Sequence, residues 1–160
     1  MSTVLSINQV DQSSNGLKVL QIATVKHIID CDANPYVPNG WKSESHRKHG
    51  MFNWNQKKIH LYLPANRKLG KCIEGKKLQK EVENQPIVNA NVLDYLLVHP
   101  ELIPESWKGE VIFFWATIYR DSFGRLCVRC LYWNGNSWRW IYHWIDDDLR
   151  SSVPAAIFAK

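Results

Sequence analysis

Long apolar runs are missing from this sequence of 160 residues. No stretch approaches the roughly 18 consecutive apolar residues that a membrane-spanning helix needs, and residues 1–15 lack the basic and then apolar layout of a secretory signal peptide. Cysteine is also scarce, because the four residues at positions 31, 72, 127 and 130 cannot form the dense disulfide framework of a small secreted protein. We therefore expect a soluble, cytoplasmic protein with reduced thiols and no membrane contact.

The short motifs of the common enzyme classes are absent as well. The sequence contains no phosphate-binding P-loop, no dinucleotide-binding glycine fingerprint, no nucleophile elbow and no HExxH zinc motif. Cys127 and Cys130 have CxxC spacing, but they lie in a predicted strand, where residues three apart face opposite sides of a sheet. No second pair exists to complete a zinc ribbon. We expect no metal and no cofactor, and enzymatic activity is not favoured.

The C-terminal third of the chain is the stretch around which we expect the fold to be organised. It contains three runs rich in β-branched and aromatic residues, separated by Asp-Ser-Phe-Gly and by Asn-Gly-Asn-Ser, which are turn signals. Three antiparallel strands are therefore predicted, over residues 111–119, 126–133 and 138–145. In the first strand, a period of two places residues 113, 115, 117 and 119 on one face and residues 112, 114, 116 and 118 on the other.

The third predicted strand alternates most clearly. Its aromatic residues point to one side, and residues 139, 141, 143 and 145 point to the other. We call these aromatic residues the aromatic ladder: Trp138, Trp140, Tyr142 and Trp144. Each large aromatic removes about 150–250 Å² from water on burial, so the ladder is first a candidate for the core. The alternative is a half-exposed ladder that binds a protein partner, a ligand or nucleic-acid bases, because indole N–H groups favour a wet side.

Further elements are predicted before this meander. The expected helices are residues 74–83 and 89–98, and the expected strands are residues 17–29 and 55–63. We expect residues 1–16 to be a flexible tail and residues 17–160 to be a single α+β domain. Its mostly antiparallel sheet is built on the three-stranded meander, with one or two short helices packed on it.

Two segments between residues 30 and 50 could bind a metal but are better explained as loops. Asp30, Asp32 and Asn34 resemble the start of a calcium-binding loop, but proline and tryptophan occupy the positions where that loop needs glycine and a bidentate glutamate. We interpret this segment as a turn held by Asx side chains. His46 and His49 are three residues apart, but the sequence identifies no acid or nucleophile as their catalytic partner, so residues 42–50 are predicted to be a solvated loop.

Basic charge is concentrated in one quarter of the chain. Residues 41–80 contain eleven Lys or Arg and two Glu, a net charge of +9, whereas the whole chain carries +5. Aromatic residues are interleaved with them, and this combination is typical of proteins that bind single-stranded nucleic acid. The simpler interpretation is a solvated surface. The candidate polyanion-binding residues are Arg47, Lys48, Lys57, Lys58, Arg67, Lys68 and Lys71.

The best acidic group for a metal-dependent phosphoryl-transfer enzyme or nuclease is residues 146–148, three consecutive aspartates that Asp121 or Asp30 could join. Consecutive residues of a strand point to alternate faces, so at most two of the three could converge. Charged residues that guard the end of an apolar strand against unwanted pairing explain the group more simply.

The order of several segments resembles a family of small uncharacterised bacterial proteins. These segments are residues 30–41 (Asp-Cys-Asp-Ala-Asn-Pro-Tyr-Val-Pro-Asn-Gly-Trp), 46–48 (His-Arg-Lys), 73–75 (Ile-Glu-Gly), 89–97 (Asn-Ala-Asn-Val-Leu-Asp-Tyr-Leu-Leu), 102–108 (Leu-Ile-Pro-Glu-Ser-Trp-Lys) and 114–121 (Phe-Trp-Ala-Thr-Ile-Tyr-Arg-Asp). The resemblance covers residues 29–159. It implies a self-contained domain and brings no activity, ligand or catalytic residue with it.

The sequence therefore favours a non-enzymatic binding protein. A protein partner or a second copy of the chain, bound through the aromatic ladder, is the first hypothesis, because Trp and Tyr dominate interface hot spots. Nucleic acid bound by the basic segment is the second, and the phosphoryl-transfer enzyme is the third.

Overall fold

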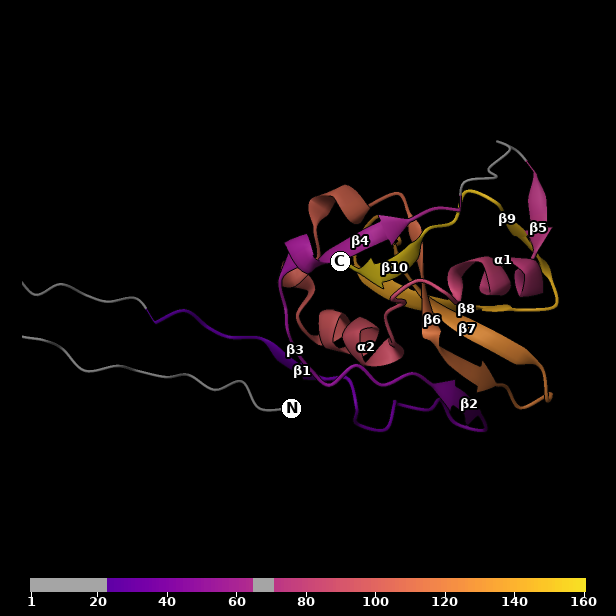
Figure 1. The fold of residues 1–160 in the computed structure, drawn as a ribbon, viewed down its shortest axis with the longest axis horizontal. Coiled ribbons are helices and arrows are strands. Elements are labelled where there is room, and N and C mark those ends of the chain that lie inside the picture. Colours follow the sequence, from indigo (N-terminus) through magenta and orange to yellow (C-terminus); the bar gives the residue numbers. More distant parts are fainter. Residues whose placement is uncertain (1–22, 65–70) are drawn as a thin grey trace, which may run out of the picture.

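The computed structural model describes residues 23–64 and 71–160, which form one α+β domain, as the sequence predicts. Its main sheet has six strands in the order β4-β10-β6-β7-β8, with β2 also paired to β6 (Figure 1). Two small sheets, β1-β3 and β5-β9, complete the fold. The strands are β1 (Ile28–Asp30), β2 (Lys42–His46), β3 (Met51–Asn53), β4 (Ile59–Tyr62), β5 (Cys72–Glu74), β6 (Val111–Arg120), β7 (Leu126–Trp133), β8 (Trp138–Trp144), β9 (Asp148–Arg150) and β10 (Ala155–Phe158). The helices are α1 (Gly75–Val82) and α2 (Ala90–Val98), with short 3-10 helices at Gln56–Lys58, Pro100–Leu102 and Glu105–Trp107.

The predicted three-stranded meander is confirmed. β6, β7 and β8 pair in sequence and antiparallel. Gly124 and Gly135 have φ values of +80° and +93° in the two turns, a conformation that side chains with a Cβ disfavour. Both predicted helices also form, within a residue or two of their expected ends. Among the described residues, neither helix is long and apolar enough to cross a membrane.

The two helices cover opposite faces of the sheet. Leu93 and Leu96 of α2 belong to a core cluster that includes Ile112 and Phe114 of β6. Leu78 and Val82 of α1 belong to a second cluster, with Phe113, Trp115 and Val128 from the sheet. The sheet therefore has an α2 side and an α1 side. α1 is amphipathic, whereas α2 is apolar and buried over most of its length.

A bulge in β6 corrects the predicted alternation. The register with β7 shifts between Phe113 and Ile118, and Trp115 and its neighbour Ala116 both pack into the cluster on the α1 side. Beyond this point the faces are exchanged, so Tyr119 lies on the α2 side beside Cys127. The expectation that residues 113, 115, 117 and 119 share one face is therefore wrong for the second half of the strand, because one extra residue inverts every later side chain.

Two predictions for the N-terminal half also need correction. Residues 42–46, expected in a solvated loop, form β2 and pair with the end of β6, although four of the five side chains are exposed. Of the strand expected over residues 17–29, only Ile28 and Ile29 lie in a described strand, and residues 23–27 are irregular. Residues 17–22 and the predicted tail 1–16 lie outside the described residues.

The predicted strand at residues 55–63 forms over Ile59–Tyr62, after a 3-10 turn. Its neighbour in the sheet is β10, which comes from the end of the chain and runs antiparallel to β4 and parallel to β6. The C-terminal residues, which carry only a weak strand signal, thus take an inner position in the sheet.

Candidate interaction surface

The aromatic ladder lies on the α2 side of β8, as the alternation predicts. Trp138 and Trp140 pack against the edge of the core cluster on that side, and Trp144 packs against Tyr119 and Cys127. The three tryptophans are half-buried, and Tyr142 is 37% exposed. The ladder is therefore neither a dry core nor a free surface, and its outer half faces solvent.

The loop between β1 and β2, which contains Tyr36 and Trp41, covers part of the ladder. The ring of Trp41 meets Tyr142, Tyr119 and Trp140 edge to face, with centroids 4.8, 5.7 and 6.1 Å away. The backbone carbonyl of Tyr36 accepts a hydrogen bond of 3.1 Å from the Tyr119 hydroxyl. Pairs of this geometry stabilise beyond the area they bury, so the loop is held on the ladder by its rings.

Large exposed aromatics gather around this loop. Tyr36 is 56% exposed, and Phe123, in the turn between β6 and β7, is 82% exposed. A Cβ on Gly40 would lie 3.5 Å from Ser122, so the loop and the turn adjoin. We call the resulting patch the aromatic surface: Tyr36, Trp41, Phe123, Trp140, Tyr142 and Trp144. A patch of neighbouring apolar side chains that reach the surface is typical of a protein-interaction site.

Cations lie over three tryptophan rings on this side of the sheet. The charge centre of Arg125 is 3.8 Å from the Trp144 ring, that of Arg129 is 4.2 Å from Trp140, and Lys108 Nζ is 4.0 Å from Trp133. Each distance is well within the range in which a ring face attracts a cation. Trp140 and Trp144 of the ladder are thus each stacked on a cation, and Trp133 lies 5.5 Å from the ladder ring of Trp138.

Each of these cations also has a carboxylate partner. Lys108 pairs with Glu105 at 2.9 Å, and Arg125 pairs with Asp146 and Asp147, both at 2.8 Å. The first two residues of the predicted acidic group therefore neutralise an arginine. Among the described residues, no three His, Cys, Asp or Glu are placed to hold a metal.

The most deeply buried of these pairs joins Arg129 of β7 to Asp94 of α2. The guanidinium, whose residue is 1% exposed, donates to both carboxylate oxygens, at 2.7 and 3.0 Å. Burial alone would lower the pKa of Arg129, but the bonds to Asp94 raise it above its usual value. The Arg129 Nε has no hydrogen-bond partner among the described residues. A buried pair of this kind fixes α2 on the sheet beneath the ladder.

Trp144 is fixed by a second polar contact. Its indole Nε1 donates to Asp121 Oδ2 at 2.7 Å, while Asp121 Oδ1 accepts from the backbone N–H groups of Phe123 and Arg125. Burial raises the pKa of Asp121, but these hydrogen bonds outweigh it and lower the pKa below its usual value. The turn that carries Phe123 and the end of the ladder are therefore built as one unit.

Within the part of the chain that the structure describes, the backbone of β8 is open on its outer side. Asn134 donates to the Ser137 carbonyl and Ile145 donates to the Leu126 carbonyl, so every second residue from Ser137 to Ile145 directs its N–H and C=O towards β7. The intervening residues, which are the ladder residues, direct theirs away from the sheet. No described strand pairs with this outer edge. β8 also keeps an unbroken register over seven residues and contains no proline or bulge that would protect it.

The opposite side of β8 carries Arg139, Ile141 and His143. His143 stacks on Phe113 at 5.4 Å, and burial lowers its pKa although Asp147 acts in the other direction. Arg139 is exposed, and its Nε donates to the Ser137 hydroxyl at 3.1 Å. The two sides of the strand thus differ in chemistry as well as in burial.

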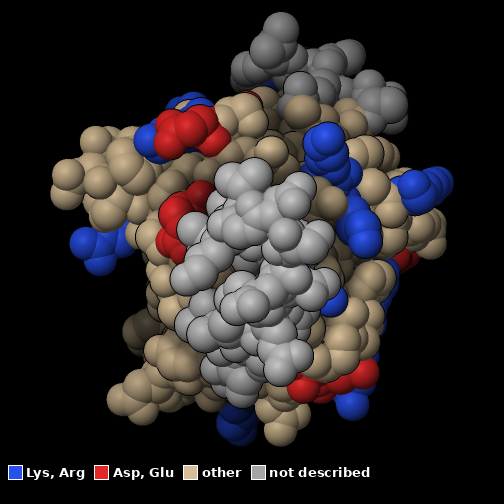
Figure 2. All heavy atoms as spheres, turned by 90° about the vertical axis from the view of Figure 1, so that its left-hand side faces the viewer, with Lys and Arg blue, Asp and Glu red and all other residues tan. Residues whose placement is uncertain are grey.

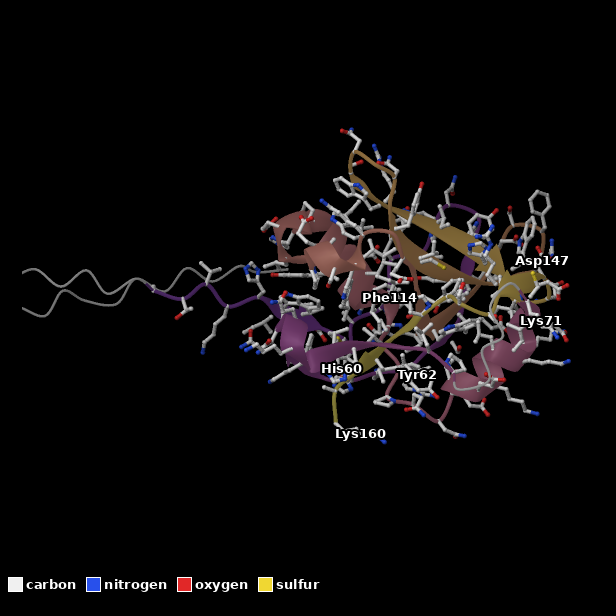
Figure 3. All side chains as sticks on the ribbon, turned by 90° about the horizontal axis from the view of Figure 1, so that it is seen from above. His60, Tyr62, Lys71, Phe114, Asp147 and Lys160 are labelled. Carbon is white, nitrogen blue, oxygen red and sulfur yellow. The ribbon has the colours of Figure 1, made fainter. Side chains whose placement is uncertain are left out.

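The candidate polyanion-binding residues do not gather at one place. Arg47 donates to the carbonyls of Glu83 and Gln85, after the end of α1, and so has a structural partner. Lys58 lies beside the C-terminal strand, since its carbonyl accepts from Ala159, and Lys71 lies next to β9. Figure 3 shows Lys71 well away from His60 of β4.

The remaining candidates do not change this picture. Lys48 and Lys57 are exposed, and Arg67 and Lys68 lie outside the described residues. On the face drawn in Figure 2, Lys and Arg side chains form several separate groups with other residues between them.

Two histidines and two cysteines that the sequence suggested as possible ligands or thiols all contact other residues of the fold. His46 Nδ1 lies 2.9 Å from the Thr117 hydroxyl, and burial lowers the pKa of His46. The ring of His49 stacks on Phe158 at 3.6 Å. Burial raises the pKa of the Cys31 and Cys127 thiols to about 12, so neither is a thiolate near neutral pH.

Residues 30–34 form the turn that the sequence predicts. Asp30 Oδ1 accepts from the N–H groups of Asp32 and Ala33, and Asn91 Nδ2 donates to the carbonyls of Asp30 and Ala33. Carboxylates that would be calcium ligands instead hold the backbone, and α2 fixes the turn from below.

One cleft of about 290 Å³ lies between β2 and α1, on the α1 side. Its floor is apolar, formed by Trp115, Ala116 and Ile118, and Arg47 and Glu83 lie at its wall. Ser45, His46 and Gln79 also line the cleft. Arg47 is engaged with carbonyl groups and the His46 ring with the Thr117 hydroxyl, so two of the polar side chains already have partners within the fold.

No protein-family model, curated protein or solved structure matches this chain. The resemblance to a bacterial family therefore stays a prediction, and the function has to be argued from the surface itself.

Proposed function

We propose that this protein is a non-enzymatic binding module that takes up an extended segment of a partner protein as an additional strand on β8. The single observation that carries the proposal is the coincidence of an open strand edge with the aromatic ladder. The same residues, Trp140, Tyr142 and Trp144, direct their backbone groups outward and their side chains along the aromatic surface.

Strand addition of this kind uses two sources of binding energy. Main-chain hydrogen bonds to the edge supply affinity, and pockets for alternate side chains supply specificity. On β8 the half-buried rings are already held by Trp41 and by the stacked cations, so little side-chain freedom would be lost on binding. Pre-ordered Trp, Tyr and Arg are also the residues that dominate interface hot spots.

The experiment uses two substitutions at one position. Tyr142→Pro removes an outward N–H and spares the bonds between β7 and β8, because the N–H of residue 142 points away from β7. Tyr142→Ala is the matched control, since it removes the ring but keeps the N–H. A random peptide library is selected on the wild-type protein, and the affinity of the recovered peptides for both variants is measured by fluorescence anisotropy.

We expect peptide binding to be lost in Tyr142→Pro and weakened in Tyr142→Ala. Hydrogen exchange at Trp140 and Tyr142 should slow when a peptide is bound, because their outward N–H groups become hydrogen-bonded. Failure of the library to yield any ligand, or unchanged binding to Tyr142→Pro, would contradict the proposal.

Nucleic-acid binding by the basic segment is the weaker proposal, because the described basic residues lie on separate elements. Lys48→Ala tests it better than Arg47→Ala, since Arg47 also holds the segment that follows α1. Salt-sensitive binding of a labelled oligonucleotide that weakens in Lys48→Ala would support it.

A further inference from the structure

The side of β8 that faces away from the ladder contains a cation with no acidic partner. Arg139 is exposed, and the only described hydrogen bond of its side chain is the one to the Ser137 hydroxyl. No described carboxylate lies within ion-pair distance of its guanidinium. On the ladder side, by contrast, Arg125, Arg129 and Lys108 each have a carboxylate within 3 Å. Arg139 is thus the cation along this strand that still lacks a counter-charge within the described residues.

The geometry of an added strand says which residue would reach Arg139. Since the backbone groups of residue 139 face β7, the residue opposite it on an antiparallel added strand would form a non-hydrogen-bonded pair. In such pairs the side chains approach closely, with Cβ atoms about 4.5–5.5 Å apart. The residues on either side of that position would point to the other face and lie over Trp138 and Trp140.

A second copy of this chain does not supply the missing charge. β8 itself contains no acidic residue, so no pairing confined to β8 places a carboxylate opposite Arg139, and Asp147, which follows the strand, is already paired with Arg125. In the symmetric antiparallel arrangement that uses all the outward-facing groups, Arg139 of each copy would lie opposite His143 of the other. His143 has no negative charge to offer the guanidinium, and burial lowers its pKa, so this arrangement leaves Arg139 without a counter-charge.

We infer that the segment that adds to β8 carries an acidic side chain opposite Arg139, flanked on both sides by aromatic or branched apolar residues that lie over the ladder. The inference rests on the proposed function and names its ligand class: an extended peptide in which apolar residues alternate with polar ones, one of them Asp or Glu.

Two probe peptides test the inference. Both are acetylated, amidated and labelled with fluorescein through a Gly-Ser linker, and both have alternating Val and Thr. One has Glu at the central Thr position and the other has Lys there. Binding is measured by fluorescence anisotropy at low ionic strength, where exposed charge pairs are least screened. The proteins are the wild type, Arg139→Gln, Arg139→Glu and Tyr142→Pro.

We expect the Glu peptide to bind the wild type roughly three- to tenfold more tightly than the Lys peptide, as an opposite-charge pair facing a like-charge pair implies. Arg139→Gln should abolish the preference but keep the binding, and Arg139→Glu should reverse it. Tyr142→Pro should bind neither peptide.

The outcomes that overturn the inference are separable from those that overturn the proposed function. If both peptides bind wild type equally, or if the preference for Glu survives in Arg139→Glu, the inference fails while strand addition stands. If neither peptide binds the wild type better than it binds Tyr142→Pro, strand addition itself fails. Sedimentation velocity adds one further outcome, because a wild-type dimer that becomes a monomer in Tyr142→Pro would assign β8 to a second copy and overturn the inference.

Discussion

The two sides of β8 differ in how their charges are satisfied. On the α2 side, Arg125 and Arg129 each lie over a tryptophan ring and pair with carboxylates of this chain. On the α1 side, Arg139 lies in solvent with a serine hydroxyl as its only described partner. The arginines near β8 therefore have two different roles. Arg125 and Arg129 hold the fold together, whereas Arg139 contributes little to its stability and is free to contact another molecule.

The largest expected effect comes from removing the carboxylate partner of Arg129 on the α2 side. Asp94→Ala leaves the Arg129 charge buried without its partner, and we expect the free energy of unfolding to fall by about 3–5 kcal/mol in urea titrations. The double variant Asp94→Leu/Arg129→Leu is the control and should recover much of the loss, because an apolar pair avoids the desolvation cost. A loss below about 1 kcal/mol for Asp94→Ala would show that this pair behaves like an exposed one.

The next largest effect distinguishes the residues of β8 whose N–H faces β7 from those whose N–H faces away from the sheet. Ile141→Pro removes an N–H that faces β7, together with side-chain contacts on the α1 side, and should cost about 3 kcal/mol or more. Tyr142→Pro, one residue later, should cost about 1–2 kcal/mol, mainly from the lost contact with Trp41. Circular dichroism with urea unfolding measures both, and equal losses would refute the assignment of outward backbone groups.

A smaller effect is expected at the end of the ladder, and it depends on pH. Trp144→Phe removes the donor to Asp121 and should lower Tm by a few degrees at neutral pH. Since the pKa of Asp121 is lower in the folded protein, this group stabilises the fold above its unfolded pKa of about 3.9, and the contribution is lost as pH falls through the folded pKa. The loss of stability on acidification should therefore be shallower in Trp144→Phe, and an identical acid limb would contradict this.

The smallest effect is expected at Arg139, on the α1 side of β8. Arg139→Ala should change the free energy of unfolding by no more than about 0.5 kcal/mol, because no acid of the fold depends on it. The same variant should bind peptides without regard to their charge. A clear destabilisation would mean that Arg139 has a structural partner and that the contrast between the two sides is weaker than we describe.

The local elements could be predicted from the sequence, but their surroundings could not. Residue types and turn signals are sufficient for β6, β7 and β8, since strand pairs joined by short turns are local. The alternation of β8 also placed the ladder correctly. The bulge at Trp115 and Ala116 left no signal in an apolar run, and β2 is polar and forms only because β6 offers it an edge.

The candidate surface shows the same division. The four ladder residues were identifiable by their period of two, whereas the rings that complete the surface come from Tyr36 and Trp41, distant in the chain. The partner of Arg129 was equally hidden, because Asp94 is unremarkable in its helix until α2 is docked on the sheet. Contacts between distant segments depend on the whole packing arrangement and not on local propensity.

The inner position of β10 has a consequence for how this chain acquires its structure on the ribosome. β4 is made before most of the other strands of the main sheet, yet its described neighbour, β10, is made after all of them. A nascent chain that has emerged only as far as β8 therefore has β4 without a partner, and its apolar residues are open to chaperones. Contacts so distant in sequence also slow folding, so we expect the sheet to close only after residues 155–158 have left the exit tunnel.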